Sequence, residues 1–252
     1  MQTKPVLYVF GISHYCEKAR WALDYLGIDY KLHFLAAGLH GRAVRKLGAP
    51  RSSLPVLATG NEVIQGSAAI IDWAEAYKAA HTAQSVSLES PDNQDEVKQI
   101  EKRLDDVLGV HVRRYYYSEA LVFYPAQVRA IFTSDLAGFP KVFTLVAWPL
   151  IRRLMMKGMD LGAAQHLQSR ERVAKELEWL DGLLADKQYL VGDRLSRADL
   201  TAASLLAPLV SPAQHPKCIQ LPPKLSADSE LWRQRRSMQW TADLYGKYRS
   251  AH

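Results

Sequence analysis

The sequence predicts an α/β domain over residues 1–81, followed by a linker over 82–93 and an all-helical domain over 94–252. In the first part, short apolar segments and amphipathic stretches alternate in the order β-α-β and then β-β-α. Elements in this order pack as a mixed four-stranded sheet with helices on its faces. Beyond the linker, apolar residues recur at helical spacing, as at Val173 and Leu177, and no set of strands is evident.

Each element of the first domain follows from a local pattern. The first strand is an apolar run that ends at Gly11, and the first helix ends at Gly27, a residue type common after the last helical turn. The turn sequence TGN between two apolar segments indicates a hairpin, and Ser67 is a capping residue for the last helix. The expected elements are a strand over 5–11, a helix over 16–27, a strand over 30–35, a loop with a short helix over 36–53, a hairpin over 54–66 and a helix over 67–80.

Composition and charge favour a soluble globular protein and give no indication of nucleic-acid binding. Hydrophobic residues make up 48% of the chain and charged residues 23%, and the net charge of +6 comes from bases scattered among acids. The two cysteines, Cys16 and Cys218, lie far apart and outline no disulfide framework, which favours a reducing compartment. The first residues show no signal-peptide pattern, so we expect a cytoplasmic protein.

The longest uncharged apolar run is VFTLVAWPLI, residues 142–151. It is well short of the roughly 20 residues that span a bilayer, and it contains Pro149, so we expect no transmembrane segment. A core or interface helix broken by the proline is the favoured interpretation. Contact with a membrane surface is the alternative, because the basic sequence IRRLMMK follows.

The junction between the first strand and the first helix carries the sequence SHYC, residues 13–16. Ser13 is expected near the N-terminal cap of the helix and Cys16 in its first turn. The N–H groups at a helix N-terminus favour an anion, and a thiolate placed there has a depressed pKa. Two interpretations stay open: these residues form a thiolate site, or Ser13 only caps the helix while Cys16 packs inward.

Two further segments bear on the same chemistry. In SSLPVL, a cis bond before Pro55 would turn the backbone of Leu54 outward, where it could pair with an extended peptide; an ordinary trans proline is the alternative. In QGSAAI, the N–H groups at the helix that Ser67 begins could hold a carboxylate, and Gln65 offers an amide nearby; a plain helix cap is the alternative. Ser196 and Asp199, in GDRLSRADL, form the pattern of a structural capping box.

In their order and spacing these motifs resemble the cytosolic glutathione S-transferase (GST) family, in particular bacterial-type members with an S-x-x-C motif. SHYCEKARWAL resembles the family's S-x-x-C-x-[KR]-x-R helix start, and LPVL resembles its cis-proline segment. QGSAAIIDW resembles its E-S-x-A-I motif, and GDRLSRADL resembles its G-x-x-x-[ST]-x-A-D capping motif. The resemblance covers most of the chain and is strongest over 5–80 and 186–210. It implies a thioredoxin-like N-terminal domain, an all-helical GST C-terminal domain and a homodimer.

The resemblance also implies an activity and its residues. Glutathione would be the co-substrate, and its thiolate would attack a small electrophile. Ser13 takes the catalytic position, where a hydroxyl donates to the glutathione sulfur, and Cys16 falls at the second-cysteine position of glutaredoxin-like motifs. The backbone of Leu54 would pair with the cysteinyl part, and Ser67 would hold the γ-glutamyl end. The implied glutathione-binding residues are Leu54, Pro55, Gln65, Gly66 and Ser67.

The sequence departs from the family's pattern in two places. Gly66 stands where the family often has an acidic or amide side chain, and GAPRSSLP lacks the N-P-x-G-K-V-P character. These departures leave the ligand for the glycyl carboxylate unidentified, and Arg51 is a candidate. Two other functions therefore stay open: a glutathione-dependent thiol–disulfide oxidoreductase that uses Cys16, and a non-catalytic interaction module with the GST fold.

The middle of the chain, residues 110–165, is rich in aromatic residues and methionine. Helices there would border the electrophile pocket of a family member, but helix–helix core and dimer contact are at least as consistent with the pattern. The residues in question are Tyr115, Tyr116, Tyr117 and Trp148. No metal-binding spacing, P-loop, dinucleotide fingerprint or nucleophile elbow is present, so no metal is expected.

Overall fold

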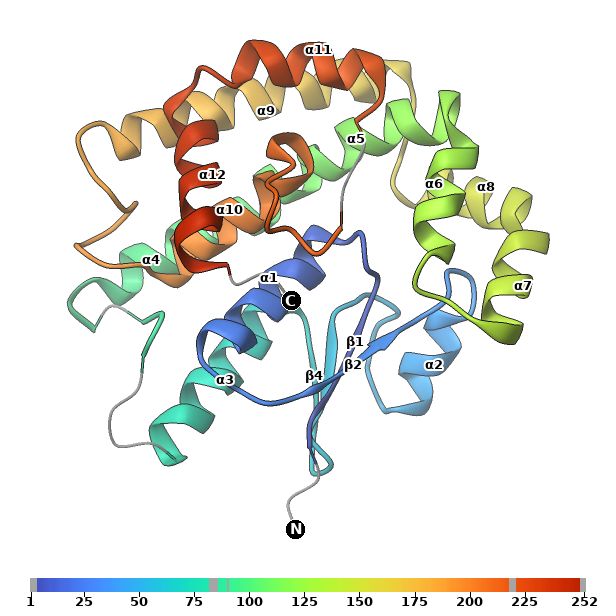
Figure 1. Ribbon diagram of the computed structural model, residues 1–252, viewed down its shortest axis with the longest axis horizontal. Coiled ribbons are helices and arrows are strands. Elements are labelled where there is room, and N and C mark those ends of the chain that lie inside the picture. The colour runs from blue at the N-terminus through green and yellow to red at the C-terminus, as the bar shows by residue number, and fades with distance from the viewer. Residues whose placement is uncertain (1–3, 82–85, 90, 218–220, 250–252) are drawn as a thin grey trace. The chain divides into compact units, whose positions relative to one another are not determined.

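The computed structural model in Figure 1 describes residues 4–81, 86–89, 91–217 and 221–249. The chain divides into two compact units. The first unit holds the residues up to 87 together with Ala126–Leu154, and the second holds Leu88–Pro125 and the residues from Met155 onward.

The first unit contains the mixed four-stranded sheet that the sequence predicts (Figure 1). Its strands are β1 (Val6–Val9), β2 (Lys31–Phe34), β3 (Val56–Ala58) and β4 (Val63–Gln65), arranged in the order β2-β1-β3-β4. β1 runs parallel to β2 and antiparallel to β3, and β4 pairs antiparallel with β3. The helices between the strands are α1 (His14–Tyr25), α2 (His40–Lys46) and α3 (Ser67–His81).

Alternation along the strands supplies a core to each face of this sheet. Leu7 and Val9 are fully buried on one face, while Tyr8 between them packs on the opposite face. On that second face Tyr8 joins a cluster centred on Val44 of α2 and Val56 of β3. In Figure 1, α1 and α3 lie together on one side of the sheet and α2 lies on the other.

Three helices from the expected helical domain group with the sheet instead. They are α6 (Pro125–Thr133), α7 (Gly138–Val146) and most of α8 (Trp148–Gly158). An aromatic chain joins them to β1, because the ring of Phe132 lies 5.7 Å from Phe10 and 6.2 Å from Trp148. The sequence analysis assigns residues 94–252 to one helical domain, whereas the contacts group residues 126–154 with the sheet.

A close approach at Gly38 fixes α7 and α8 on the same unit. A Cβ atom at Gly38 would lie 3.2 Å from the side chains of both Phe143 and Ile151. The backbone there has φ +88°, a conformation that L residues with side chains rarely adopt. Glycine is therefore required at this position for both reasons.

In its described part the second unit contains helices joined by loops and no strand, as the sequence predicts for this region. Its helices are η1 (Pro91–Asn93), α4 (Gln94–Arg103), η2 (Leu104–Leu108), α5 (Gly109–Phe123), α9 (Ala163–Leu184), α10 (Arg197–Val210), α11 (Pro223–Trp232) and α12 (Arg236–Tyr248). Of the expected linker, residues 82–85 and 90 lie outside the described residues, and Leu88 is fully buried. Arg197 is buried and pairs with Glu89 at 2.7 Å and with Glu101 at 2.6 Å.

The capping box predicted for α10 is present. The carboxylate of Asp199 accepts the backbone N–H of Ser196 at 2.8 Å and that of Leu190 at 2.7 Å, and the Ser196 hydroxyl donates to it at 2.6 Å. Asp199 is fully buried, and this burial raises its pKa to about 6. The carboxylate satisfies backbone donors that have no access to water.

We expect Asp199→Ala to lower the free energy of unfolding by about 2–4 kcal/mol, because two buried N–H groups lose their acceptor. Urea denaturation followed by circular dichroism measures the change. Asp193→Ala, at an exposed position in the same loop, serves as the control and should leave stability within about 0.5 kcal/mol. Equal stabilities for the two variants would show that the box contributes nothing.

Candidate active site

The register of the sheet brings three of the sequence-predicted segments to one edge. Tyr8 in β1 lies opposite Val56 in β3, which in turn lies opposite Gln65 in β4. The end of β1, the start of β3 and the end of β4 therefore meet at the same edge. The turn to Ser13, the Leu54–Pro55 segment and the start of α3 all follow or precede these strand ends directly.

Ser13 is the N-cap residue of α1, as predicted. Its extended backbone places its carbonyl to accept the N–H of Glu17 at 2.9 Å, and its own N–H donates to the Phe10 carbonyl at 3.1 Å. The hydroxyl oxygen accepts the N–H of Cys16 at a long 3.4 Å. Because the hydroxyl acts there as an acceptor, its hydrogen can be donated to another group. The side chain is half-buried and thus accessible to a ligand.

Cys16 lies in the first turn of α1, but its environment disfavours a thiolate. The residue is 1% exposed, and burial raises the pKa of its thiol to about 11. The opposing influences of Ser13, the Phe10 backbone and Arg20 are smaller than this desolvation. The expectation of a depressed pKa from helix position alone is therefore not met, because the thiol faces the protein interior.

The Leu54–Pro55 peptide bond is cis. Pro55 and Val56 are buried, while Leu54 is half-buried just before β3 begins. Among the described residues, none forms a hydrogen bond with the backbone N–H or carbonyl of Leu54. The backbone of Leu54 therefore keeps a donor and an acceptor for an extended partner, as the sequence suggests.

The side chain of Gln65 is hydrogen-bonded to the loop that precedes the cis peptide. Its side-chain amide donates to the carbonyls of Arg51 and Ser53, each at 2.7 Å, and its carbonyl accepts the N–H of Arg51 at 3.0 Å. These three hydrogen bonds hold the loop that leads into the cis peptide. Gln65 is thus a positioning residue for this loop, while the Arg51 side chain is exposed.

Gly66 and Ser67 connect β4 to α3. Gly66 has φ +103°, which explains in conformational terms why glycine replaces the larger side chain common in the resembled motif. Its N–H donates to the Pro55 carbonyl at 3.0 Å, which joins this segment to the cis peptide. Ser67 is buried at the first position of α3, where helix N–H groups point toward the same sheet edge.

Comparison with known families shows to which family the chain belongs. The model of the glutathione S-transferase N-terminal domain matches residues 7–81, and that of the glutathione S-transferase C-terminal domain matches residues 143–227. The chain belongs to the glutathione S-transferase family. Among curated proteins, none matches this GST in sequence at a significant level.

Solved structures agree with the family fold. The GST resembles the β-etherase LigF from Sphingobium sp. strain SYK-6 with TM-score 0.62 and 18% identity, over 96% of this chain and 99% of that one. GSTFuA3 from Phanerochaete chrysosporium gives TM-score 0.63 and 15% identity, over 100% of both chains. CsGST63524 of Ceriporiopsis subvermispora, solved in complex with glutathione, gives TM-score 0.65 and 16% identity, over 99% of both. At these identities the likeness establishes the thioredoxin-like and helical fold alone.

A small apolar hollow lies beside the Ser13 turn of this GST. Residues from the ends of β1 and β2 line it on one side, and α6 with the segment after it lines the other. Its volume is 10 Å³, about the space of one water molecule. The lining residues are Phe10, Gly11, Ile12, Phe34, Leu35, Ile131, Phe132, Asp135 and Leu136. The sequence analysis missed the α6 residues, although an apolar spacing of three to four over 128–136 was available as a signal.

The aromatic residues proposed from the sequence occupy other places. Tyr115 is fully buried in the second unit, stacks on His166 at 4.7 Å and donates to the Asp228 carboxylate. Tyr116 and Tyr117 are also buried in α5. The structure thus favours the helix-core interpretation for all three tyrosines, while Trp148 packs against Phe132 in the first unit.

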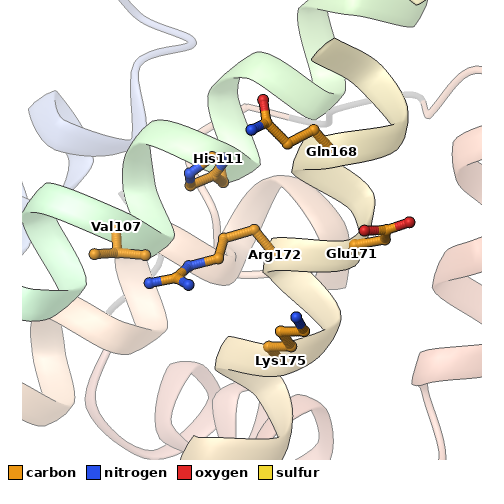
Figure 2. A pocket seen from close by; sticks show the side chains of 6 residues that line it. All are labelled: Val107, His111, Gln168, Glu171, Arg172 and Lys175. Carbon is orange, nitrogen blue, oxygen red and sulfur yellow. The ribbon is translucent and has the colours of Figure 1, made fainter. Parts of the chain in front are cut away.

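A larger hollow of 330 Å³ lies in the second unit between α5 and α9 (Figure 2). Its lining residues are Val107, His111, Gln168, Glu171, Arg172 and Lys175. In Figure 2, His111 projects from α5, and the side chain of Arg172 extends from α9 toward the same helix. Burial, Arg114 and Arg172 lower the pKa of His111, and its Nδ1 lies 3.2 Å from the Ser169 hydroxyl. None of the sequence-predicted site residues lines this hollow.

The described part of the chain offers no cluster of three or more His, Cys, Asp or Glu side chains that could hold a metal ion. Among the described helices, none has both the length and the apolar character needed to cross a membrane.

We expect Cys16 to react slowly with iodoacetamide in the folded protein. With a pKa of about 11 instead of the ordinary 9.0, its thiolate fraction near pH 8 is about 100-fold smaller than in the urea-unfolded chain. Mass spectrometry of the Cys16 peptide measures the two rates. Because the folded-state pKa is raised, the associated stability is present below pH 9 and is lost as the pH rises toward 11. Equal alkylation rates in both states would show an accessible thiolate.

Proposed function

We propose that this GST stabilises the thiolate of glutathione for attack on a small electrophile. One observation supports the proposal above all. The register of β1, β3 and β4 gathers the Ser13 hydroxyl, the Leu54 backbone and the start of α3 at one sheet edge. Glutathione carries a thiol, a central peptide unit and a terminal α-carboxylate, and these three groups correspond to the three features of the edge.

The proposed binding mode uses backbone groups for most of its contacts. The cysteinyl residue of glutathione would pair with the N–H and carbonyl of Leu54 as a short antiparallel strand. The γ-glutamyl carboxylate would lie at the N-terminus of α3 beside Ser67, where N–H groups and the helix dipole favour an anion. Gln65 would act indirectly, because its three hydrogen bonds fix the loop before Leu54. The exposed guanidinium of Arg51 is our candidate for the glycyl carboxylate.

The chemistry requires the sulfur as an anion at neutral pH. Ser13 would donate its hydroxyl hydrogen to this sulfur, and the first N–H groups of α1 would add a favourable potential. Loss of the thiol proton to water leaves the thiolate. The sulfur lone pair then forms a bond to the electrophilic carbon, and either a leaving group departs with its electron pair or an activated double bond takes up a proton.

The buried thiol of Cys16 counts against the thiol–disulfide alternative, which needs this sulfur to reach a glutathione disulfide. The third possibility, an interaction module without catalysis, would leave the edge unable to bind glutathione. As the family resemblance implies, we further propose that the protein acts in the cytoplasm as a homodimer.

The apolar part of the electrophile would lie beside Ser13, in the hollow that Phe132 helps to line. This placement needs a rearrangement of the lining side chains, because a volume of 10 Å³ admits no organic substrate. The lining is apolar except for Asp135, so the proposal favours hydrophobic electrophiles.

Ser13→Ala should lower kcat/KM for a chromogenic aromatic electrophile by about a hundredfold, because one hydrogen-bond donor to the thiolate is lost. Thiolate absorbance should decrease in parallel, whereas calorimetric affinity for glutathione should change by less than about tenfold. Cys16→Ser is the matched control in the same helix turn and should keep both activity and thiolate absorbance. Loss of activity in Cys16→Ser alone would instead support thiol exchange.

Phe132→Ala should raise the ratio of kcat/KM for a bulky electrophile over a small one by about tenfold, because removal of a large lining side chain enlarges the hollow. Phe139→Ala is the control, since Phe139 belongs to the next helix and is 72% exposed. Unchanged selectivity in Phe132→Ala, with the fold intact by circular dichroism, would place the electrophile elsewhere.

A further inference from the structure

Helices α7 and α8 carry an exposed apolar surface. Ten large hydrophobic residues are exposed in the described part of the chain, and six of them fall within the 16 residues from 139 to 154. We call these six the apolar face: Phe139, Val142, Leu145, Val146, Leu150 and Leu154. Val146, for example, is 77% exposed. Scattered exposed hydrophobics are ordinary, but a group of this kind marks an interaction surface.

Helical spacing groups most of the apolar face on one side of each helix. Phe139, Val142 and Val146 fall within about 60° of one another around α7, since each residue advances the helix by about 100°. Leu150 and Leu154 are one turn apart on α8. The apolar face thus runs along both helices.

Other sides of the two helices are already engaged. Thr144 of α7 is buried, and Phe143 contacts the backbone turn at Gly38. In α8, Trp148 and Ile151 are buried, with Trp148 against Phe132 and Ile151 against Gly38. The inward contacts therefore fix the rotation of both helices and leave the apolar face exposed.

The same segment carries positive charge only. Residues 136–159 include no Asp or Glu. Its four bases are Lys141, Arg152, Arg153 and Lys157. Lys141, Arg153 and Lys157 are exposed, and Lys157 follows Leu154 by three positions along the same side of α8. Exposed apolar side chains and exposed bases therefore occur together on the same two helices.

We propose that the apolar face docks this protein on the surface of a bilayer that contains anionic phospholipids. Large apolar residues flanked by bases characterise helices that lie in the membrane interface. The apolar residues would enter the boundary of the acyl region, and the bases would pair with lipid phosphates. Helices of nine and 11 residues are too short to span, so they lie along the surface.

Charge complementarity favours a bilayer over a second copy of the chain. In a two-fold interface the same face would contact itself, which brings the exposed bases of each copy toward those of the other. No acid of the segment would offset this repulsion. An anionic lipid surface complements both the apolar residues and the bases. The proposal is independent of glutathione binding.

Sedimentation with lipid vesicles tests the proposal on the full chain. The probes are vesicles of phosphatidylcholine alone and of phosphatidylcholine mixed with phosphatidylglycerol. We expect partition onto the mixed vesicles at least about tenfold above that onto the neutral ones, and a decrease as salt is raised. Analytical ultracentrifugation without lipid records the oligomeric state of each variant.

Three variants separate the contributions. Val142→Asp with Val146→Asp and, separately, Lys141→Glu with Arg153→Glu should each lower partition onto the mixed vesicles by about tenfold or more. Leu231→Asp is the matched control, because Leu231 is 70% exposed on α11, outside the apolar face. It should bind as the wild type does.

Several results would overturn the proposal. One is that the wild type does not bind the mixed vesicles, or binds neutral vesicles equally well. Another is that the double aspartate variant binds the mixed vesicles as the wild type does. The wild type could also fail to bind vesicles and form an oligomer in their absence. If the double aspartate variant were then monomeric, the apolar face would be assigned to contact with a second copy of the chain. Circular dichroism confirms that each variant is folded.

Discussion

Phe10 joins the Ser13 turn to the packing of the first unit. Its carbonyl accepts the N–H of Ser13, while its ring contacts Phe132 of α6 and the ring of His40 at 4.8 Å. Burial lowers the pKa of His40, so this imidazole is neutral at pH 7 and packs as an aromatic group. The turn that presents the Ser13 hydroxyl is therefore fixed by α2 and α6 together, and it cannot move without disturbing both.

This constraint gives two neighbouring polar side chains opposite properties. Ser13 and Cys16 share one helical turn, yet the first is half-buried at the sheet edge and the second is enclosed. A helix N-terminus lowers the pKa of a thiol only where the thiol can meet its N–H groups, and complete desolvation outweighs it here. The same turn thus favours the hydroxyl as the group that can meet a ligand.

Most of the first domain could be predicted from local patterns. Gly27, Ser67 and the TGN turn indicate where elements end or begin, and strand alternation around Tyr8 follows from side-chain periodicity. The start of α10 could be predicted as well, because Ser196 and Asp199 act within three residues of each other. These features depend on interactions between residues that are close in the sequence, so a short stretch of sequence is enough to predict them.

Other features depend on contacts between distant residues. The grouping of residues 126–154 with the sheet rests on the contact between Phe132 and Phe10 and on the close approach at Gly38. The spacing of apolar residues in the sequence does not identify the partners in either contact. Likewise, the sequence suggests that the amide of Gln65 binds a ligand. Its three hydrogen bonds to the loop depend on the pairing of β4 with β3, which the local sequence does not show. The sequence could thus indicate which segments meet at the sheet edge, but not the environments of their side chains.

The most direct test of the central claim is a glutathione titration followed by amide chemical shifts in a nitrogen-labelled sample. If the sheet edge binds glutathione, the largest shifts will fall on Leu54, Ser67 and the residues of the Ser13 turn, and they will saturate together. Shifts confined to the hollow of His111 and Arg172, or none at all in the folded protein, would contradict the account.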